Sequence, residues 1–361
     1  MPFRPIATAS LLAGIALVFY ASDLRDTPLS MAERAFVTEA QSATKPPQLF
    51  FHLADDTWLQ PAGVYATALV HAFGGGDHAG RMAGTFVGAI NVGLIYFTAR
   101  LLFGRELLAL AAAALLLSMP AHGWYAREGS SAIYATPFVL TWAIGVLQFL
   151  SSGARVWLAL AGLSLGLGML THPAAPLTMA CLFVVTLFGS RFRRETFARD
   201  LGALLLPFAI VIALIALHFW LYPDIYADTF GRWAILKAHL RYPLDGLRAQ
   251  INWNTLSNRA TIFWGLLDPS FLLFAPENRR FAPLPIVFAA LVPLGLMRVL
   301  DFAPPSHRVI VFSLCLVPPI VAATFGIAHD LSATVAMTAG IALIAAAGVE
   351  WLARRFGLFA A

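Results

Sequence analysis

The sequence of 361 residues is 59% hydrophobic and only 12% charged, with a mean hydropathy of +0.75. These values exclude an ordinary soluble domain and place the chain among polytopic membrane proteins. The net charge of +5 does not indicate a nucleic-acid partner, because the basic residues form short clusters at the ends of apolar segments, where they act as topology signals.

About ten apolar windows are long enough to cross a hydrocarbon core of roughly 30 Å. They lie near 5–21, 80–101, 107–123, 131–150, 156–171, 173–189, 201–220, 282–299, 309–326 and 332–352. The first could pass for a signal peptide, but the spans that follow favour an uncleaved helix. The fifth and sixth share the junction Thr171-His172-Pro173 and could form a broken or re-entrant pair. We predict an all-α, polytopic membrane protein with a single transmembrane domain over residues 1–361.

Arginines in the short connections set the predicted orientation. With the N-terminus in the cytoplasm, the clusters around Arg100, Arg155, Arg193, Arg308 and Arg354 all lie on the cytoplasmic side, as does the C-terminus. Two long segments, 22–79 and 221–281, then face outward. Long structured loops in compact proteins are usually functional, so these two loops form the predicted active face.

The first outer loop contains two predicted surface helices. Segment 31–42 has no glycine or proline, and at about 100° per residue its polar and apolar side chains separate onto two faces. The polar face carries Glu33, Arg34, Thr38 and Gln41, and the apolar face carries Ala32, Phe36 and Ala40. A second helix is predicted from Thr57 to Phe73, with Trp58 and Tyr65 as interface anchors and three glycines closing it. In the second loop, the apolar run 263–274 predicts a helix broken at Asp268-Pro269.

Several short motifs follow one another along the chain. They are Trp58-Leu59-Gln60-Pro61, Gly80-Arg81, Ala99-Arg100-Leu101-Leu102-Phe103-Gly104-Arg105, Trp124-Tyr125-Ala126-Arg127, a glycine-rich run 161–168 ending at Thr171-His172-Pro173, and 267–274. In this order they resemble the polyprenyl-phosphate-dependent GT-C glycosyltransferases, the superfamily of protein O-mannosyltransferases and lipid A aminoarabinose transferases, and most closely their small bacterial members. The resemblance covers nearly the whole chain, and its specificity comes from the order of motifs that are individually weak.

The resemblance implies an inverting glycosyltransferase of the bacterial inner membrane. Such enzymes move a sugar from a polyprenyl-phosphate donor to a lipid, glycan or protein acceptor on the extracytoplasmic side. Phosphate is already a fair leaving group, so the protein chiefly needs a carboxylate that takes the proton of the acceptor and cations that stabilise the departing lipid phosphate. Besides donor and acceptor, the expected partners are membrane lipids.

Four carboxylates are candidates for this chemistry. Glu33 is the predicted base, although it could instead be a solvated carboxylate on a surface helix. Asp55 and Asp56 are rivals in the same loop, where an aspartate could equally cap a helix. Glu128 could join Glu33 around a divalent cation such as Mg or Mn, as the second-loop carboxylate does in some relatives, but a local ion pair with Arg127 is the preferred interpretation. The sequence makes no cofactor certain and leaves this divalent cation as the one candidate.

For the lipid phosphate the predicted ligands are Arg81, Arg127 and His172, all at outer ends of helices. Arginine can grip a phosphate through two parallel hydrogen bonds, and the two arginines lie at matched family positions. His172 follows a helix break, where a histidine is more often structural. A further basic group, Arg232, Lys237, His239 and Arg241, lies in the second outer loop.

Two other classes of function stay open. A transporter or flippase for lipid-linked sugars would usually keep ionisable groups near mid-bilayer, and charged residues within the predicted spans are scarce. A degenerate, non-catalytic relative is favoured by Ala32, because family members usually carry an Asp-Glu pair where this chain has Ala32-Glu33.

Overall fold

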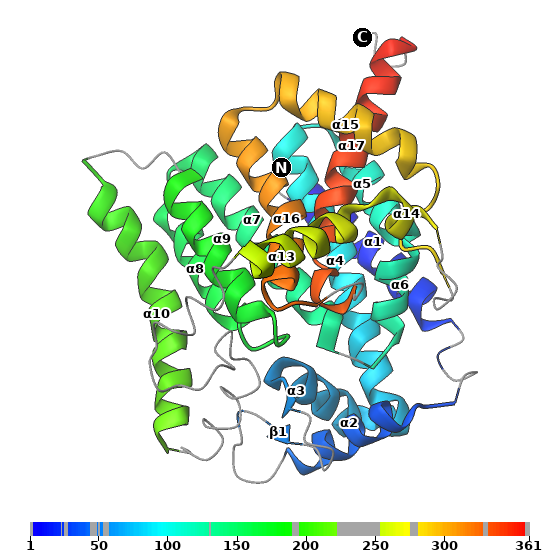
Figure 1. The fold of residues 1–361 in the computed structure, drawn as a ribbon, viewed down its shortest axis with the longest axis vertical. Helices are drawn as coiled ribbons and strands as arrows, with labels where there is room; N and C mark the ends of the chain where they lie inside the picture. Colours follow the sequence, from blue (N-terminus) through cyan, green and yellow to red (C-terminus); the bar gives the residue numbers. More distant parts are fainter. Residues whose placement is uncertain are drawn as a thin grey trace.

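The computed structural model describes residues 3–357 except 23, 25–27, 44–48, 50, 53–57, 130, 190–194, 222–252, 275–280 and 328–330. This part of the chain is a helical bundle with one pair of two-residue strands, so the predicted all-α class is confirmed (Figure 1). Helices suit a lipid-embedded chain because each satisfies its backbone hydrogen bonds within one segment. Asp55, Asp56 and the basic group at 232–241 lie outside the described residues.

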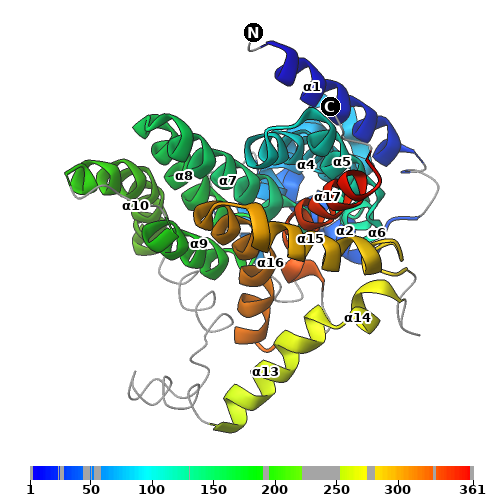
Figure 2. The same ribbon diagram turned by 90° about the horizontal axis from the view of Figure 1, so that it is seen from above.

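The bundle is built from eleven helices. They are α1 (Phe3–Ala21), α4 (Ala79–Phe103), α5 (Glu106–Ser118), α6 (Pro120–Arg127), α7 (Ala135–Ser152), α8 (Arg155–Gly168), α9 (Ala175–Gly189), α10 (Phe197–Leu221), α15 (Phe288–Phe302), α16 (Pro305–Thr324) and α17 (Met337–Arg355). Figure 2 shows α1 and α10 at opposite edges, with α4, α5, α7 and α17 between them.

The chain is an integral membrane protein, but the predicted number of about ten spans is not confirmed. Among the described residues, six helices are long and apolar enough to cross a membrane, or seven when α5 and α6 are taken as one broken span. The predicted span 107–123 bends by 63° between these two helices. The bend follows Met119, where Pro120 begins α6 and offers no backbone N–H to continue α5. Helices α8 and α9 have only 14 and 15 residues.

The elements of the first outer loop gather at one end of the bundle, drawn at the bottom of Figure 1 and called here the α2 end. They are α2 (Met31–Ser42), the antiparallel strands β1 (Phe51–His52) and β2 (Trp58–Leu59), α3 (Pro61–Val70) and the distorted turn η1 (His71–Gly75). The opposite end, which carries the α4–α5 and α15–α16 turns and the last turn of α17, is called the Arg354 end.

The predicted start of the second surface helix at Thr57 is wrong. Trp58 and Leu59 pair with Phe51 and His52 as a strand, and the helix starts at Pro61, whose fixed φ suits the first helical position. The predicted glycine stop is confirmed, because Gly74 adopts a positive φ of 90° inside η1. In the second loop, α13 (Trp253–Leu267) and α14 (Pro269–Leu273) are separated at Asp268, which caps α14, as predicted.

A polar cluster lies inside the bundle where α1, α4 and α6 meet. The hydroxyl of Tyr20 lies 2.8 Å from Nδ1 of His122, and Nδ2 of Asn91 lies 3.4 Å from Nε2 of the same ring. All three side chains are buried. A buried polar group costs free energy unless it is hydrogen-bonded, so this cluster fixes α1 against α6 at a defined height.

Helices α15 and α17 cross at two glycines that permit backbone contact. A Cβ at Gly295 would lie 1.8 Å from the carbonyl oxygen of Ile344, and one at Gly348 would lie 2.2 Å from that of Leu291. Without water to drive association, membrane helices depend on such close packing. These glycines therefore hold α17, the most buried of the candidate spans, in place.

We predict that Gly295→Ala destabilises the protein by about 1–3 kcal/mol, because the added methyl group meets backbone atoms that cannot move aside. Gly202→Ala on α10 is the matched control, since a Cβ there has nothing within 4 Å. Thermal unfolding in detergent measures both variants. Equal midpoints for the two would contradict the proposed backbone contact.

Candidate functional site

Helix α2 begins and ends where the sequence predicts, at Met31 and Ser42. Its first turn is closed by a capping box: the hydroxyl of Ser30 accepts from the backbone N–H of Glu33 at 3.2 Å, and the carboxylate of Glu33 accepts from the N–H of Ser30 at 2.8 Å. Its apolar face packs on α3, where the ring of Phe36 lies over Gly63. The spacing Ser-x-x-Glu is the sequence signal that predicts this cap.

The expected exposed face of α2 is only partly confirmed. Arg34, Thr38 and Gln41 are exposed, but the side chain of Glu33 is 11% exposed and points into the protein. The reason is a partner 48 residues away in the sequence, the buried Arg81 at the start of α4. The solvated-carboxylate interpretation of Glu33 is therefore wrong.

Glu33 and Arg81 form a two-pronged ion pair. Nε of Arg81 donates to Oε1 of Glu33 at 2.6 Å, and Nη2 donates to Oε2 at 2.9 Å. The guanidinium group also donates to the carbonyl oxygens of Leu24 at 3.0 Å and Pro28 at 3.2 Å. Arginine and carboxylate match in this parallel geometry, which gives both strength and direction.

The turn after α6 completes the surroundings of Glu33. The backbone N–H of Gly129 donates to Oε1 of Glu33 at 3.4 Å. Gly129 lies close to α4 and α2, since a Cβ there would lie 3.4 Å from the backbone of Gly80 and 3.6 Å from Cγ of Glu33, which is van der Waals contact. Four segments thus meet at the carboxylate of Glu33: the first outer loop before α2, α2 itself, α4 and the turn after α6.

The electrostatics of the pair favour the ionised carboxylate. Burial acts to raise the pKa of Glu33, but the hydrogen bonds from Arg81 and Ser30 and the charge of Arg81 outweigh it and lower the pKa from 4.5 to about 2. In this arrangement Glu33 is a fixed anion and a weak base.

Arg127 lies at the same end of the bundle but faces α1. Its Nη2 donates to the carbonyl oxygen of Phe19 at 3.0 Å, and its guanidinium carbon lies 5.5 Å from the centre of the Phe19 ring. A cation beside the last carbonyls of α1 is favourable because they carry partial negative charge. Nε of Arg127 is buried without a hydrogen-bond partner in the described structure, so this side chain retains a donor.

His172 lies in the turn between α8 and α9, where its Nδ1 accepts from the backbone N–H of Ala174 at 3.1 Å. In the same turn the carbonyl oxygen of Leu170 accepts from the N–H of Ala62 at the start of α3, at 3.1 Å. This turn therefore contacts the start of α3 in the first outer loop. The hydrogen bond that His172 accepts stabilises the turn.

The predicted cation site at Glu33 and Glu128 does not have a metal-binding donor set. The described residues contain no group of three or more His, Cys, Asp or Glu side chains that could hold a metal ion. Both oxygens of Glu33 already accept from Arg81, and backbone N–H groups of Ser30 and Gly129 complete its surroundings. Glu128 is the C-cap of α6, with its N–H bound to Trp124. The N–H donors around Glu33 suit its anionic carboxylate, and they are not ligands for a metal ion.

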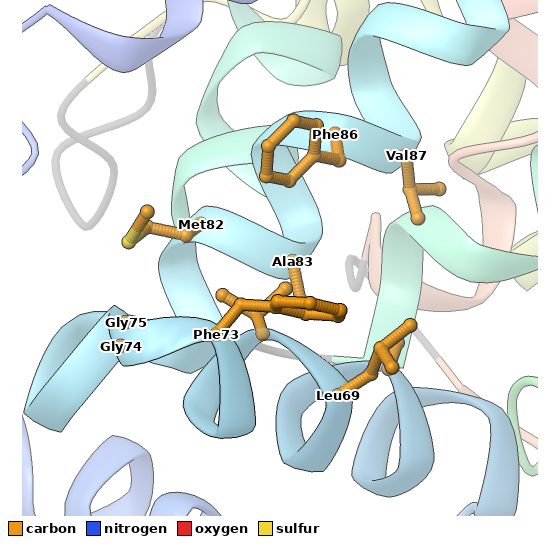
Figure 3. Close-up of a pocket in the computed structure, with 10 residues that line it drawn as sticks. Leu69, Phe73, Gly74, Gly75, Met82, Ala83, Phe86 and Val87 are labelled. Carbon is orange, nitrogen blue, oxygen red and sulfur yellow. The ribbon is translucent and has the colours of Figure 1, made fainter.

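Two cavities of about 490 Å³ lie near the start of α4, and neither is lined by Glu33 or Arg81. The apolar groove lies between α3 and α4, with Leu69, Phe73 and Phe86 on its walls (Figure 3). At about 100° per residue its α4 residues lie on the face of the helix away from Arg81. The polar cavity lies over the exposed face of α2 and is lined by Arg34, His78 and Pro28, whose carbonyl also accepts from Arg81.

We predict strong coupling between Glu33 and Arg81 in a double-mutant cycle. Glu33→Gln keeps a residue that can close the capping box but leaves the buried guanidinium without its counter-ion, so it should cost about 3–5 kcal/mol. Combined with Arg81→Gln, the loss should fall short of the sum of the single losses by about 1–3 kcal/mol. Additive unfolding free energies would show that the two side chains do not interact.

We also predict an acid-dependent loss of stability from the lowered pKa of Glu33. A carboxylate whose pKa falls on folding stabilises the protein above its unfolded pKa of 4.5, and this contribution is lost as pH falls toward about 2. The difference in melting temperature between the parent and Glu33→Gln should therefore be constant above about pH 5 and shrink below it. A difference that stays constant down to about pH 3 would contradict the lowered pKa.

Comparisons with known proteins agree with this architecture. Residues 60–221 match the family model described as dolichyl-phosphate-mannose-protein mannosyltransferase. No curated protein matches the sequence. Among solved structures, the Archaeoglobus fulgidus oligosaccharyltransferase AglB, in complex with an inhibitory peptide and a dolichol-phosphate, superposes with a TM-score of 0.58 at 13% identity. The match covers 98% of this chain and 51% of that one.

The same archaeal enzyme in its apo form gives a TM-score of 0.60 at 12% identity, over 100% of this chain and 52% of that one. The chain thus spans about half the length of the oligosaccharyltransferase it matches. ArnT from Cupriavidus metallidurans bound to undecaprenyl phosphate matches less closely, with a TM-score of 0.44 at 13% identity over 98% of this chain and 78% of that one. The predicted resemblance is confirmed by the family model, which matches residues 60–221, and by a fold shared with the membrane part of a known glycosyltransferase.

Proposed function

We propose that this protein is a membrane glycosyltransferase that uses a polyprenyl-phosphate sugar donor and acts at the α2 end. The observation that carries the proposal is the buried pair of Arg81 and Glu33, a phosphate-binding cation and a carboxylate held side by side in a GT-C fold. The match to AglB, solved with a dolichol-phosphate, supports a lipid phosphate as part of the donor. The acceptor is a lipid, a glycan or a protein.

The pair itself suggests how binding and catalysis are linked. The phosphate of a sugar donor is a diester with one negative charge and two non-bridging oxygens, so it can accept the same two parallel hydrogen bonds from a guanidinium that a carboxylate accepts, and it gains a second charge as the sugar departs. If Arg81 turns toward the phosphate, Glu33 loses the hydrogen bonds and the charge that lower its pKa, and burial then raises that pKa. Glu33 would become a base only when the donor is bound, ready to take the proton of the acceptor hydroxyl or amine.

Arg127 supplies a second cation for the same phosphate. Its unpartnered Nε and its place two residues before Gly129 support a role beside Arg81. His172 is less well suited, since its Nδ1 accepts from Ala174. Asp55 and Asp56 stay predictions as rival catalytic carboxylates. Glu128 stays a prediction as a partner of Glu33. No step of the reaction is assigned to a metal ion.

The two cavities near the start of α4 suit the two ends of such a donor. The groove between α3 and α4 is apolar and open, as a polyprenyl chain requires, and it begins at Met82, next to Arg81 in the sequence (Figure 3). The polar cavity over α2 offers charged and amide groups to sugar hydroxyls. Sugar transfer would then take place at the start of α4, between His78 of the polar cavity and Met82 of the groove.

We further propose that the α2 end faces outward from a bacterial inner membrane, with both termini in the cytoplasm. Basic residues concentrate at the Arg354 end, in the α4–α5 turn, at the start of α8 and in the last turn of α17. Positive charge next to spanning helices favours the cytoplasmic side.

A non-catalytic relative is the second candidate function. The observation that favours it is the complete use of Glu33 in structure, through the capping box and the Arg81 pair, combined with Ala32 where GT-C relatives usually carry an acid. In that case the pair would fix the loop as a scaffold for a partner enzyme.

Transfer of radiolabelled sugar from polyprenyl-phosphate donors by the purified protein separates the two candidates. We expect the parent to transfer sugar and Glu33→Gln to lower kcat by about 10²–10⁴-fold, as loss of a general base does. Glu39→Gln, on the same helix, is the control and should retain activity. Transfer that is equal in the parent and in Glu33→Gln would remove Glu33 as the base. No transfer by the folded parent with any donor and acceptor supplied would favour the scaffold.

A further inference from the structure

A second cationic site lies at the Arg354 end, away from the proposed active face. It is a cavity of about 180 Å³ between the α4–α5 turn, the end of α15, the start of α16 and the last turns of α17. The charged side chains on its wall are Arg105, Arg298, Glu350 and Arg354. Nothing in the proposed transfer reaction uses them.

The charges of this cavity are unbalanced. Glu350, which is buried, accepts from Nε and Nη2 of Arg298 at 3.1 Å each and from Nη2 of Arg354 at 2.8 Å, and lies 3.8 Å from Nη1 of Arg105. Three arginines therefore share a single carboxylate among the residues that line the cavity. Arg298 holds the carboxylate from inside, whereas the other two are partly exposed at the mouth.

The start of α16 adds further donors to the same wall. Nδ1 of His307 is buried and has no hydrogen-bond partner in the described structure. Nε of Arg308 donates to the carbonyl oxygen of Ala303, another lining residue, at 2.7 Å. The first turn of a helix has free N–H groups and a partial positive charge, so the start of α16 reinforces the positive potential.

The rest of the wall is apolar, with Phe103, Val299 and Val311 below the charged mouth. A charged rim over an apolar floor at the end of membrane helices has the shape of a site for an amphiphile whose headgroup is anionic. Guanidinium groups bind the non-bridging oxygens of a phosphate through charge-assisted hydrogen bonds, and two of them at the mouth can share one phosphate.

We propose that this cavity binds a phosphate group, as the headgroup of an anionic phospholipid or as free phosphate, with Arg105, Arg354 and His307 as the ligands. Arg298 and Glu350 form a fixed ion pair in the wall of the site. The apolar lining favours the lipid. The proposal does not depend on the transferase activity, because none of these residues lies at the α2 end.

Binding of labelled phosphatidylglycerol to the purified full-length protein in detergent tests the proposal. Phosphatidylcholine is the neutral lipid comparison, and inorganic phosphate is the soluble competitor. The double variant Arg105→Gln/Arg354→Gln removes both cations of the mouth, which are 42% and 46% exposed. Arg155→Gln is the control, because Arg155 lies at the same end, is 44% exposed and pairs with Asp200 away from the cavity.

We expect the parent and Arg155→Gln to prefer phosphatidylglycerol, and the double variant to bind it at least about ten-fold more weakly, as loss of two charged hydrogen bonds predicts. His307→Ala should weaken binding without disturbing any ion pair, and it decides the matter if the double variant does not fold. Competition by millimolar inorganic phosphate would identify free phosphate as a ligand, and its failure would identify the lipid. No preference over phosphatidylcholine together with no binding of phosphate, or equal binding by the double variant and the parent, would overturn the proposal.

Discussion

The first outer loop depends on the burial of one guanidinium group. Arg81 begins α4 inside the protein, where an unpaired charge is very costly, so each of its donors must find an acceptor. Among the described residues, the acceptors include the carbonyl oxygens of Leu24 and Pro28 and the carboxylate of Glu33, all from the preceding segment. The loop is therefore folded around Arg81, which fixes the start of α2 on α4 and, through Phe36 and Gly63, sets α3 beside them.

Small residues let the helices approach closely enough for this arrangement. On α4, Gly84 and Gly88 face the end of α6, where added Cβ atoms would lie 2.9 Å from the carbonyl oxygen of Ala126 and 2.5 Å from its Cβ. Lipid provides little hydrophobic driving force between helices, so shape and polar contacts decide the packing. Because α6 is held so close, the turn after it can bring Gly129 onto Glu33.

Local sequence signals predicted the elements better than the contacts between them. The bounds of α2 follow from a run free of helix breakers, and the break at Asp268-Pro269 follows from proline chemistry. The start of α3 was misplaced because strand pairing of Trp58 depends on His52, across a loop that has no periodic pattern. Helical periodicity also put Glu33 on the exposed face, since it cannot register an arginine 48 residues further along the chain. The broken span of α5 and α6 was missed because hydropathy is continuous across Pro120.

The two ends of the bundle use the same chemistry in different proportions. At the α2 end Arg81 binds the carboxylate of Glu33 through two hydrogen bonds, so an anion that displaces Glu33 from Arg81 would change the proton affinity of that carboxylate. At the Arg354 end three arginines share Glu350, so an anion can be added while the existing pair is kept. The first arrangement is suited to a reaction, in which a ligand must alter the groups that meet it. The second is suited to an anchor, in which the ligand must leave the structure as it is.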